Sequence, residues 1–482
     1  MRRPAALLLS LLTTVAGAQS ASDLPDIGNP AGTSISRDDE YRMGTMIVRQ
    51  LRDQNAIIDD PEVSEYLQSI GGRIAAQTPD GGKQFHYFAV RDADINAFAL
   101  PGGFIGVNYG TILATKNESE LASVLAHETA HVTQHHIARM IHAQGKQTIS
   151  SLAAMLALIL LGAIGGGGGN AMMGAMAAGQ GIAAQQQINF TRANENEADR
   201  VGIGFLASAG FDPQAMPAFF ETLSRRTGLS GAEVPEMIQS HPVNSNRIAE
   251  SRNRALQYGR VKPTESASYD LIRDRLRVIT ASHDTDVLDL YKKNKTDDDS
   301  ALGRQYGQAL ALMSAGKPQD AARILDKLVQ QHQSLTLLYS ALAQAEIAAG
   351  QTNDGFATFQ QAMSLFPRNV PLAVRYAEAL MANGRPKEAH ALLLDVFNNE
   401  APTPEQIRLT ALAASAAGDT GDAYFYMSEY HISSGDLPLA VQQLELALAA
   451  PNLTDVQRQR FQARLDEIRE VLAESRSRHA QR

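Results

Sequence analysis

Two histidines four residues apart, with a glutamate after the first, are the residues of this chain best placed to do chemistry. They lie in the run His127-Glu128-Thr129-Ala130-His131. Residues four apart on an α-helix share a face, with Cβ atoms about 5–6 Å apart, so both imidazoles could bind one zinc ion. Glu128 lies about 100° further round the helix, where its carboxylate could act as a general base on water. The pattern indicates a zinc-dependent hydrolase.

A catalytic zinc ion usually has three protein ligands and an open position. The longer pattern H-E-x-x-H-x-x-G-x-x-H would supply a third histidine, but Gln134 and Ile137 occupy its last two positions here. That class of zinc enzyme is therefore excluded. The adjacent His135 and His136 are alternative ligands, although the helical rotation carries them off the metal face.

Two carboxylates further along the chain are better placed to complete the site. Glu195 and Asp199 are four residues apart on a predicted helix that ends near Gly210. One carboxylate could bind zinc while the other orients a ligand histidine. The alternative is an ordinary solvated acidic face.

Composition narrows the possible partners and chemistry. The 482 residues include 43 basic and 52 acidic side chains, for a net charge of −9, and no dense Lys/Arg block. A nucleic-acid partner is therefore not expected. The chain has no cysteine, which excludes disulfides, thiolate ligands and a cysteine nucleophile. Its length allows two or three domains.

The first 18 residues predict export. Arg2 and Arg3 precede an apolar stretch from Ala5 to Val15, and Ala16-Gly17-Ala18 fits the small-x-small cleavage rule. We expect a signal peptide over residues 1–18. An uncleaved anchor is the alternative, but the apolar stretch is short for spanning a bilayer.

A small sheet should lie beside the metal helix. Strands are predicted at 85–90, 95–100 and 104–109, and the metal helix should begin at Asn117, with Glu120 completing a capping box. Two further helices are expected between residues 38 and 77.

An edge of that sheet could hold substrate. An extended peptide can add to an exposed strand through backbone hydrogen bonds, without demanding a particular sequence. Asn96, Ala97 and Phe98 on the second strand are the candidate substrate-binding residues. An ordinary hairpin is the alternative.

The two zinc-binding segments are separated by an apolar, glycine-rich stretch at residues 152–184. The 13 residues from Leu152 to Ile164 are almost all apolar, and Gly165–Gly169 follows. Thirteen residues are too few to cross a bilayer, which needs about 20. We expect a mobile arm that packs over the cleft or makes peripheral contact with a membrane or an apolar client. A buried core helix is the alternative.

The C-terminal half carries an internal repeat. Gly316, Gly350, Gly384 and Gly418 recur every 34 residues, which is the tetratricopeptide period. A small residue follows five positions after each glycine, at Ala321, Gly355, Ala389 and Ala423. Stacked helix pairs of this kind form a curved surface for a partner or client.

Together these motifs resemble the M48 metallopeptidases. The residues concerned are the H-E-T-A-H run, the segment E-N-E-A-D-R-V-G beginning at Glu195, and Ser240-His241-Pro242 with Arg247 after it. The resemblance implies that Glu195 is the third zinc ligand and Asp199 its outer-shell partner. It also places His241 and Arg247 near the metal, where either could stabilise an oxyanion.

His241 has a second possible role. Pro242 fixes the backbone after it, and the preceding stretch Gly228–Glu233 is predicted to be flexible. His241 could therefore act as a regulatory fourth ligand that keeps the resting enzyme inhibited. The alternative is a hydrogen bond to substrate or to an outer-shell carboxylate.

The resemblance also implies a setting. Exported members of this family with C-terminal repeats act on outer-membrane proteins. We therefore expect a periplasmic enzyme that degrades misfolded or stalled outer-membrane proteins. Its repeats would bind these clients or the outer-membrane β-barrel assembly machinery.

The predicted fold is mainly α. Residues 19–264 should form an α+β zinc metallopeptidase domain with one Zn²⁺ per chain, its small sheet beside the H-E-x-x-H helix. Residues 265–482 should form an α-solenoid of tetratricopeptide repeats. A rival interpretation is a chaperone-like scaffold with a latent zinc site, in which the repeats perform the function.

Overall fold

The structure is a computed structural model of the whole chain. It describes residues 36–81, 85–143, 192–228, 241–259, 266–282, 287–293 and 300–480, together with Ala157, Met237 and Val261. The predicted signal peptide and nearly all of the stretch 152–184 lie outside the described residues. Within the described part of the chain, no helix has the length and apolar character needed to cross a bilayer.

A three-stranded sheet forms the centre of the N-terminal part, which we define as elements α1 to α12. Its strands are β1 (His86–Val90), β2 (Ala97–Leu100) and β3 (Phe104–Asn108), in the order β1-β3-β2. β1 pairs parallel to β3, whereas β2 pairs antiparallel to it. The three predicted strands are present, although the second begins at Ala97 rather than Ile95.

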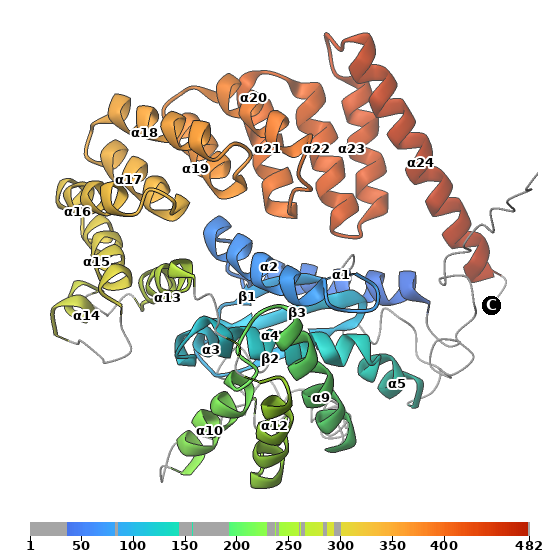
Figure 1. Cartoon of the computed structure of the whole chain (residues 1–482). Coiled ribbons are helices and arrows are strands. Elements are labelled where there is room, and N and C mark those ends of the chain that lie inside the picture. Colours follow the sequence, from blue (N-terminus) through green and yellow to red (C-terminus); the bar gives the residue numbers. More distant parts are fainter. Residues whose placement is uncertain are drawn as a thin grey trace, which may run out of the picture.

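Helices pack around this sheet (Figure 1). They are α1 (Arg37–Asp53), α2 (Pro61–Ala75), α3 (Tyr109–Ala114), α4 (Glu118–Thr133), α5 (His136–Ala143), α9 (Arg192–Ser208), α10 (Ala215–Gly228) and α12 (Ser245–Gln257), with the short helix η3 (Pro101–Gly103) before β3. α2 has a clear start signal, since the Asp60 side chain accepts the N–H of Val63 and Pro61 occupies the first turn.

The rest of the chain is helical. After α13 (Ala267–Ile279) and α14 (Val287–Lys293), helices stack in pairs to form the repeat part: α15 (Ala301–Ser314), α16 (Pro318–Gln331), α17 (Thr336–Ala348), α18 (Thr352–Leu365), α19 (Val370–Ala382), α20 (Pro386–Phe397), α21 (Pro404–Ala417), α22 (Thr420–Ser433), α23 (Leu437–Ala449) and α24 (Asp455–Ala480). The mainly α class predicted from sequence is confirmed.

The 34-residue glycines mark the turn inside each helix pair. Gly316, Gly350, Gly384 and Gly418 all have φ between 70° and 88°, the left-handed conformation that glycine adopts without steric cost at a helix end. The small residues behind them let the paired helices touch. A Cβ on Gly355, for example, would collide with the backbone of Ala343 and the side chain of Ile347.

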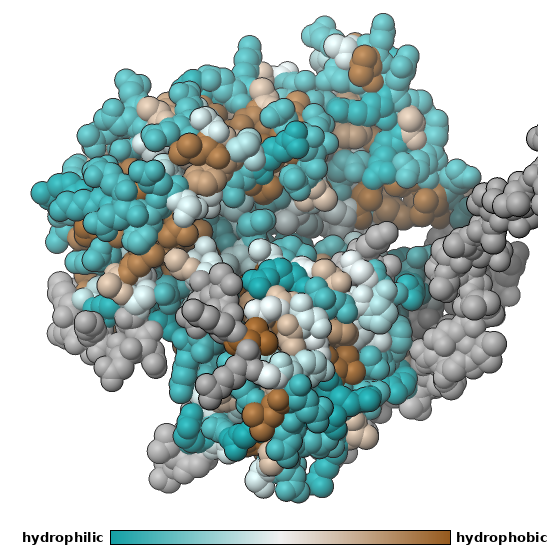
Figure 2. All heavy atoms as spheres, in the orientation of Figure 1, coloured by the Kyte–Doolittle hydropathy of each residue, from teal (hydrophilic) through white to brown (hydrophobic). Residues whose placement is uncertain are grey.

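The repeat part curves over the N-terminal part and contacts it near both ends of the arc (Figure 1). Arg49 and Arg52 of α1 pair with Asp436 and Glu405. On the face shown in Figure 2, a furrow separates the repeats from the helices below, and hydrophilic residues predominate over the outer surface of the repeats.

Near the start of the arc, two carboxylates of α2 and two arginines form a buried network. Asp60 accepts hydrogen bonds from Arg275 Nε (2.8 Å) and Nη2 (2.7 Å), and from Arg375 Nη2 (2.8 Å). Glu62 accepts from Arg375 and from Ser340 Oγ. Buried charges are stable only when paired in this way, so the network fixes α2 against α13 and α19.

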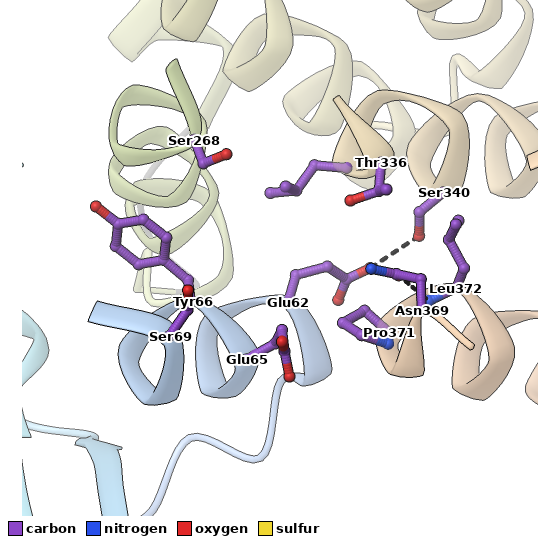
Figure 3. Close-up of a pocket in the computed structure, with 11 residues that line it drawn as sticks. Glu62, Glu65, Tyr66, Ser69, Ser268, Thr336, Ser340, Asn369, Pro371 and Leu372 are labelled. Carbon is purple, nitrogen blue, oxygen red and sulfur yellow. Dashed lines mark hydrogen bonds between the residues drawn. The ribbon is translucent and has the colours of Figure 1, made fainter. Parts of the chain in front are cut away.

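A cavity of about 140 Å³ lies beside this network (Figure 3). Its lining comes from α2 below, from α13 and α17 above and from the start of α19 at the side, and includes Glu62, Glu65, Ser268, Thr336 and Asn369. It is remote from the histidine pair of α4, so it belongs to the junction between the two parts.

Helix α13 belongs to two cores at once. Tyr269, Ile272 and Leu276 pack into the core of the N-terminal part. Leu271 and Val278 pack into the first core of the repeats. The division at residues 264 and 265 stays a prediction, and the packing joins the two sides of it.

Candidate metal centre

Helix α4 carries the histidine pair through the middle of the N-terminal core. Asn117 caps it, because its Oδ1 accepts the N–H of Glu120 (2.9 Å). The Glu120 carboxylate reaches back to the N–H of Lys116 rather than that of Asn117, which is one residue beyond the expected capping box. Every residue from Glu118 to His131 is buried, so the histidines are held in a rigid, water-poor environment.

His127 and His131 point to the same place. Their Nε2 atoms are 3.0 Å apart, and both residues are at most 1% exposed. Two ligand atoms about 2.0–2.1 Å from one tetrahedral zinc ion would be roughly 3.3 Å apart. The imidazoles therefore converge as ligands of one ion would.

Helix α9 brings the carboxylates to this point. Glu195 Oε2 lies 3.4 Å from His127 Nε2, and Oε1 lies 3.4 Å from His131 Nε2. Asp199 Oδ1 lies 3.0 Å from the other ring nitrogen of His127. Glu195 thus faces the point on which the two Nε2 atoms converge, whereas Asp199 contacts the opposite side of the His127 ring, an arrangement found in many metal sites.

A glycine allows this approach. A Cβ on Gly202 would lie 3.0 Å from the carbonyl oxygen of Ala126 and 3.2 Å from the backbone nitrogen of His127. Only glycine lets α9 pack this closely on α4 without a shift. Sequence reasoning assigned Gly202 no role, although it lies in the quoted E-N-E-A-D-R-V-G segment.

His241 completes a group of four. Its Nδ1 is 2.9 Å from Glu195 Oε1 and 3.5 Å from His127 Nε2. One ligand atom from each of His127, His131, Glu195 and His241 lies within 4.8 Å of the other three, and all four residues are buried.

Arg247 of α12 binds the carboxylates of Glu195 and Asp199. Its Nε and Nη2 atoms bind both oxygens of Asp199 (2.6 and 2.8 Å), and Nη1 lies 2.7 Å from Glu195 Oε2. Nη1 also donates to the carbonyl oxygens of His241 and Pro242. These contacts support a positioning role, while oxyanion stabilisation by Arg247 stays a prediction.

His136 contributes a contact that spacing did not reveal. Its Nδ1 lies 2.9 Å from Nδ1 of His131, and its Nε2 lies 3.2 Å from Glu197 Oε2. It therefore touches His131 on the side away from Glu195 and is not one of the four converging residues. His135 is not one of them either, since it has φ of 53° in the turn after α4.

The charges of the site favour a cation. Burial lowers the pKa of His127, but hydrogen bonds to Asp199 and Glu195 outweigh it and raise that pKa to about 9. Burial lowers the pKa of His131 well below its ordinary value, which keeps the imidazole neutral and the lone pair of one ring nitrogen available. A metal ion would displace the proton that His127 holds in its absence, and the carboxylates of Glu128, Glu195 and Asp199 with the guanidinium of Arg247 would then leave two negative charges. A divalent metal ion would balance them.

Glu128 also fits a metal centre. It is fully buried, and neither carboxylate oxygen has a hydrogen-bond partner within the described residues. Its Oε1 lies 3.8 Å from His241 Nε2. An unpaired buried carboxylate is costly unless a cation or water compensates for its charge, so these residues fit a metal ion with its water.

The candidate substrate strand lies beside α4, at one edge of the sheet. Asn96 and Ala97 are buried, and Phe98 is half-buried. The carbonyl oxygen of Ile95, just before them, accepts the N–H of Met237 (3.1 Å). The carbonyl oxygen of Met237 in turn accepts the N–H of His241 (2.8 Å). Met237 therefore links the backbone of His241 to Ile95, just before this strand.

Comparison with known proteins identifies the family. A model of peptidase family M48 matches residues 61–255, and a tetratricopeptide repeat model matches residues 346–414. The beta-barrel assembly-enhancing protease of Escherichia coli K12 is 32% identical over 94% of this chain and 93% of its own length. The chain belongs to peptidase family M48.

Other relatives agree with this assignment. The beta-barrel assembly-enhancing protease of Yersinia pestis is 33% identical over 97% of this M48 peptidase and 98% of its own length. The mitochondrial metalloendopeptidase OMA1 of Arabidopsis thaliana is 28% identical over 42% of this chain and 38% of its own. The predicted M48 metalloendopeptidase with tetratricopeptide repeats is confirmed, as is its dependence on a metal.

Proposed function

We propose that the metal of this M48 peptidase is zinc, held by His127, His131 and Glu195, and that its substrates are misfolded or stalled outer-membrane proteins. The observation that carries the site assignment is the convergence of two imidazoles and a carboxylate within 4.8 Å in a buried centre. Two nitrogen ligands and one oxygen ligand are a typical donor set for catalytic zinc.

The chain's own residues supply the proton transfers. When bound, zinc would act as a Lewis acid that polarises the scissile carbonyl group and lowers the pKa of a water molecule. Glu128 takes the proton of the attacking water and delivers it to the leaving amine. Its burial strengthens this role, because few water molecules compete for the carboxylate.

Three residues hold the ligands in place. Asp199 orients His127, His136 contacts His131, and Arg247 pairs with both Glu195 and Asp199. Partners of this kind fix the ring orientation of ligands and raise metal affinity. In this proposal Asp199 and Arg247 support catalysis by positioning the ligands.

Substrate would bind as an added strand. We propose that an extended peptide pairs with the β2 edge at Asn96, Ala97 and Phe98, which would bring its scissile bond beside α4. The edge position of β2 supports this. Backbone pairing suits a protease that acts on unfolded segments of many sequences.

We propose that His241 holds the enzyme in a resting form. His241 lies against Glu195 and His127, where it would occupy a fourth ligand position, and its segment is bonded to Ile95 beside the substrate edge. A hollow lined by His131, Leu100 and Gly102 is only about 20 Å³. Release of His241 would therefore open both the metal and the strand edge.

The setting is proposed from the relatives. Proteins named beta-barrel assembly-enhancing protease match nearly the whole chain, which supports action on outer-membrane proteins in the periplasm after cleavage of residues 1–18. The repeats, from about residue 265, would bind these clients or the outer-membrane β-barrel assembly machinery. Peripheral membrane contact through 152–184 stays a prediction about residues outside those described.

The rival is a scaffold with a latent zinc site. The contact between His241 and Glu195 favours it, because a closed four-ligand site is characteristic of structural zinc. The two functions differ in whether the purified protein turns over a substrate.

Glu128→Gln tests the proposal. We expect the variant to bind zinc as well as wild type but to cleave a misfolded outer-membrane protein about 10²–10⁴-fold more slowly, since it lacks the general base. Zinc content and cleavage rate are the two measurements. Undiminished hydrolysis by the zinc-loaded variant would disprove the role of Glu128. Absence of turnover by wild type, with client binding retained, would favour the scaffold.

A further inference from the structure

A second group of potential metal ligands lies in the repeat part, where α20, α22 and α24 meet. One ligand atom from each of His390, Asp419 and Asp422 lies within 4.8 Å of the other two. We propose that these three residues bind a divalent transition-metal ion, separate from the one in the peptidase centre.

The histidine is the observation that points to a ligand. His390 is only 8% exposed, and its Nε2 is buried without a hydrogen-bond partner in the part of the chain that the structure describes. This nitrogen lies 3.6 Å from Asp422 Oδ2, beyond normal hydrogen-bond length. Two ligands of one tetrahedral zinc ion would be about 3.4 Å apart. The gap therefore suits an ion between the two atoms better than a direct hydrogen bond.

The carboxylates are already oriented by outer partners. Asp422 Oδ1 accepts hydrogen bonds from Gln457 Nε2 (3.3 Å) and Arg460 Nη2 (2.5 Å), while its Oδ2 faces His390. Both oxygens of Asp419 accept from Gln457 Nε2 (3.3 and 3.1 Å), and its Oδ1 also accepts the N–H of Asp422. For Asp422 the outer hydrogen bonds leave Oδ2 directed at His390, as is common for ligating carboxylates; an ion at Asp419 would take the place of one contact with Gln457.

Arg460 is held in this supporting position. Its guanidinium carbon lies 4.3 Å from the centre of the Phe425 ring and 5.2 Å from that of Phe461. Contacts with both rings keep it on the Oδ1 side of Asp422. With neutral His390, two carboxylates and one guanidinium leave a single negative charge, so the group still attracts a cation.

The donor set selects the kind of ion. One imidazole nitrogen with two carboxylate oxygens suits Zn²⁺, Co²⁺ or Ni²⁺, whereas Mg²⁺ and Ca²⁺ prefer oxygen ligands alone. The ion would connect α20 with α22 and, through Gln457 and Arg460, with α24. It would thus brace the packing of α20, α22 and α24.

Zinc stoichiometry of the metal-free full-length protein tests the proposal. After equilibrium dialysis against Zn²⁺, we expect two equivalents in wild type, one in His390→Gln and one in His127→Ala/His131→Ala. The triple variant should bind none. His332→Gln, a histidine elsewhere in the repeats, is the matched control and should retain two equivalents. Circular dichroism checks that each variant is folded.

Two further measurements use the His127→Ala/His131→Ala protein. Zn²⁺ should raise its melting temperature, and Co²⁺ should give visible absorption, with both effects lost on adding Asp422→Asn. A single equivalent in wild type that His390→Gln leaves unchanged, or an unchanged second equivalent in both His390→Gln and Asp422→Asn, would overturn the proposal. A single equivalent in wild type that His390→Gln removes and His127→Ala/His131→Ala leaves unchanged would contradict the proposed function instead, so the two failures are distinguishable.

Discussion

At the peptidase centre, each converging side chain has a partner that restricts it. Asp199 restricts His127, His136 restricts His131, and Arg247 restricts Glu195. His241 differs, because the side chain that it contacts is another of the four converging residues, Glu195. It is therefore the side chain of this centre best suited to leave.

His241→Ala should raise basal proteolysis. A hydrogen bond to a charged group contributes about 1.5–3 kcal/mol, so losing the one between His241 and Glu195 should increase the open population roughly 10–100-fold. Cleavage of an unfolded peptide, including self-cleavage, is the measurement, and zinc content should be unchanged. If the increased proteolysis arises at this site, the Glu128→Gln/His241→Ala double variant must be inactive. A loss of activity in His241→Ala would show that His241 instead assists the reaction.

Sequence reasoning reached part of this centre. Helical spacing placed His127 and His131 on one face, and the family resemblance drew attention to Glu195, Asp199 and His241. It could not show that His136 contacts His131, because a turn at His135 redirects the chain between them. Nor could it show that Arg247 holds two carboxylates, since that geometry depends on how α12 packs against α9.

The crossing of α4 and α9 is the element-scale feature on which the centre depends. Gly202→Ala should push the helices apart and misplace Glu195 relative to His127. We expect zinc affinity to fall roughly 10-fold or more, as when outer-shell partners are lost, measured by competition with a chelator.

Gly204→Ala on the same helix is the matched control. An added Cβ there would meet only the hydroxyl of Tyr258, at 3.1 Å, which is the end of a side chain. Alanine favours a helix over glycine by about 1 kcal/mol, so this variant should keep its zinc affinity and its stability. Equal affinities of the two variants would contradict the role of Gly202.

The start of α2 is a second critical point. Asp60→Asn removes one partner of the buried pair with Arg275 and should destabilise the protein by about 3–5 kcal/mol at neutral pH. Denaturant unfolding measures the loss. Asp326→Asn, at an exposed helical position, is the control and should unfold like wild type.

Acid should narrow the difference between wild type and Asp60→Asn. Burial raises the pKa of Asp60, but the charges and hydrogen bonds of Arg275 and Arg375 outweigh it and hold the pKa well below its ordinary 3.8. The stabilisation is thus fully present above about pH 4 and is lost as the pH falls toward the depressed pKa. A constant difference in unfolding free energy from pH 7 to pH 3 would contradict this.

The helices and strands could be predicted from the sequence, whereas the contacts between the N-terminal part and the repeat part could not. The 34-residue period and its glycines predicted the helix pairs, and the apolar patterns predicted the sheet. Both kinds of signal arise from residues that are close together in the sequence. The pairing of Asp60 with Arg275 and Arg375 joins residues 215 and 315 positions apart. No local pattern encodes such a contact.

At the scale of the whole molecule, α13 determines where the chain can be truncated without unfolding the N-terminal part. A chain ending at residue 260 lacks Tyr269, Ile272 and Leu276, which are at most 4% exposed in the N-terminal core. Burying each contributes about 1.5–3 kcal/mol, a large share of a typical total of 5–15 kcal/mol. We expect this chain to lose cooperative melting by circular dichroism.

A chain ending at residue 282 is the comparison, because it keeps α13. This chain should melt cooperatively and cleave a small unfolded peptide. It should lose activity on a full-length outer-membrane protein, if that substrate is bound by the repeats. Cooperative melting of the shorter chain, near the temperature of the longer one, would show that α13 is dispensable to the N-terminal core.

The shared helix also affects incomplete copies of the protein. All residues proposed for catalysis, from His127 to Arg247, are synthesised before α13. A product of premature termination, or of clipping just after α12, would carry the whole set of active-site residues without the helix that closes their core. We expect such a fragment to be degraded as an unfolded chain, so that peptidase activity would be limited to copies that carry α13.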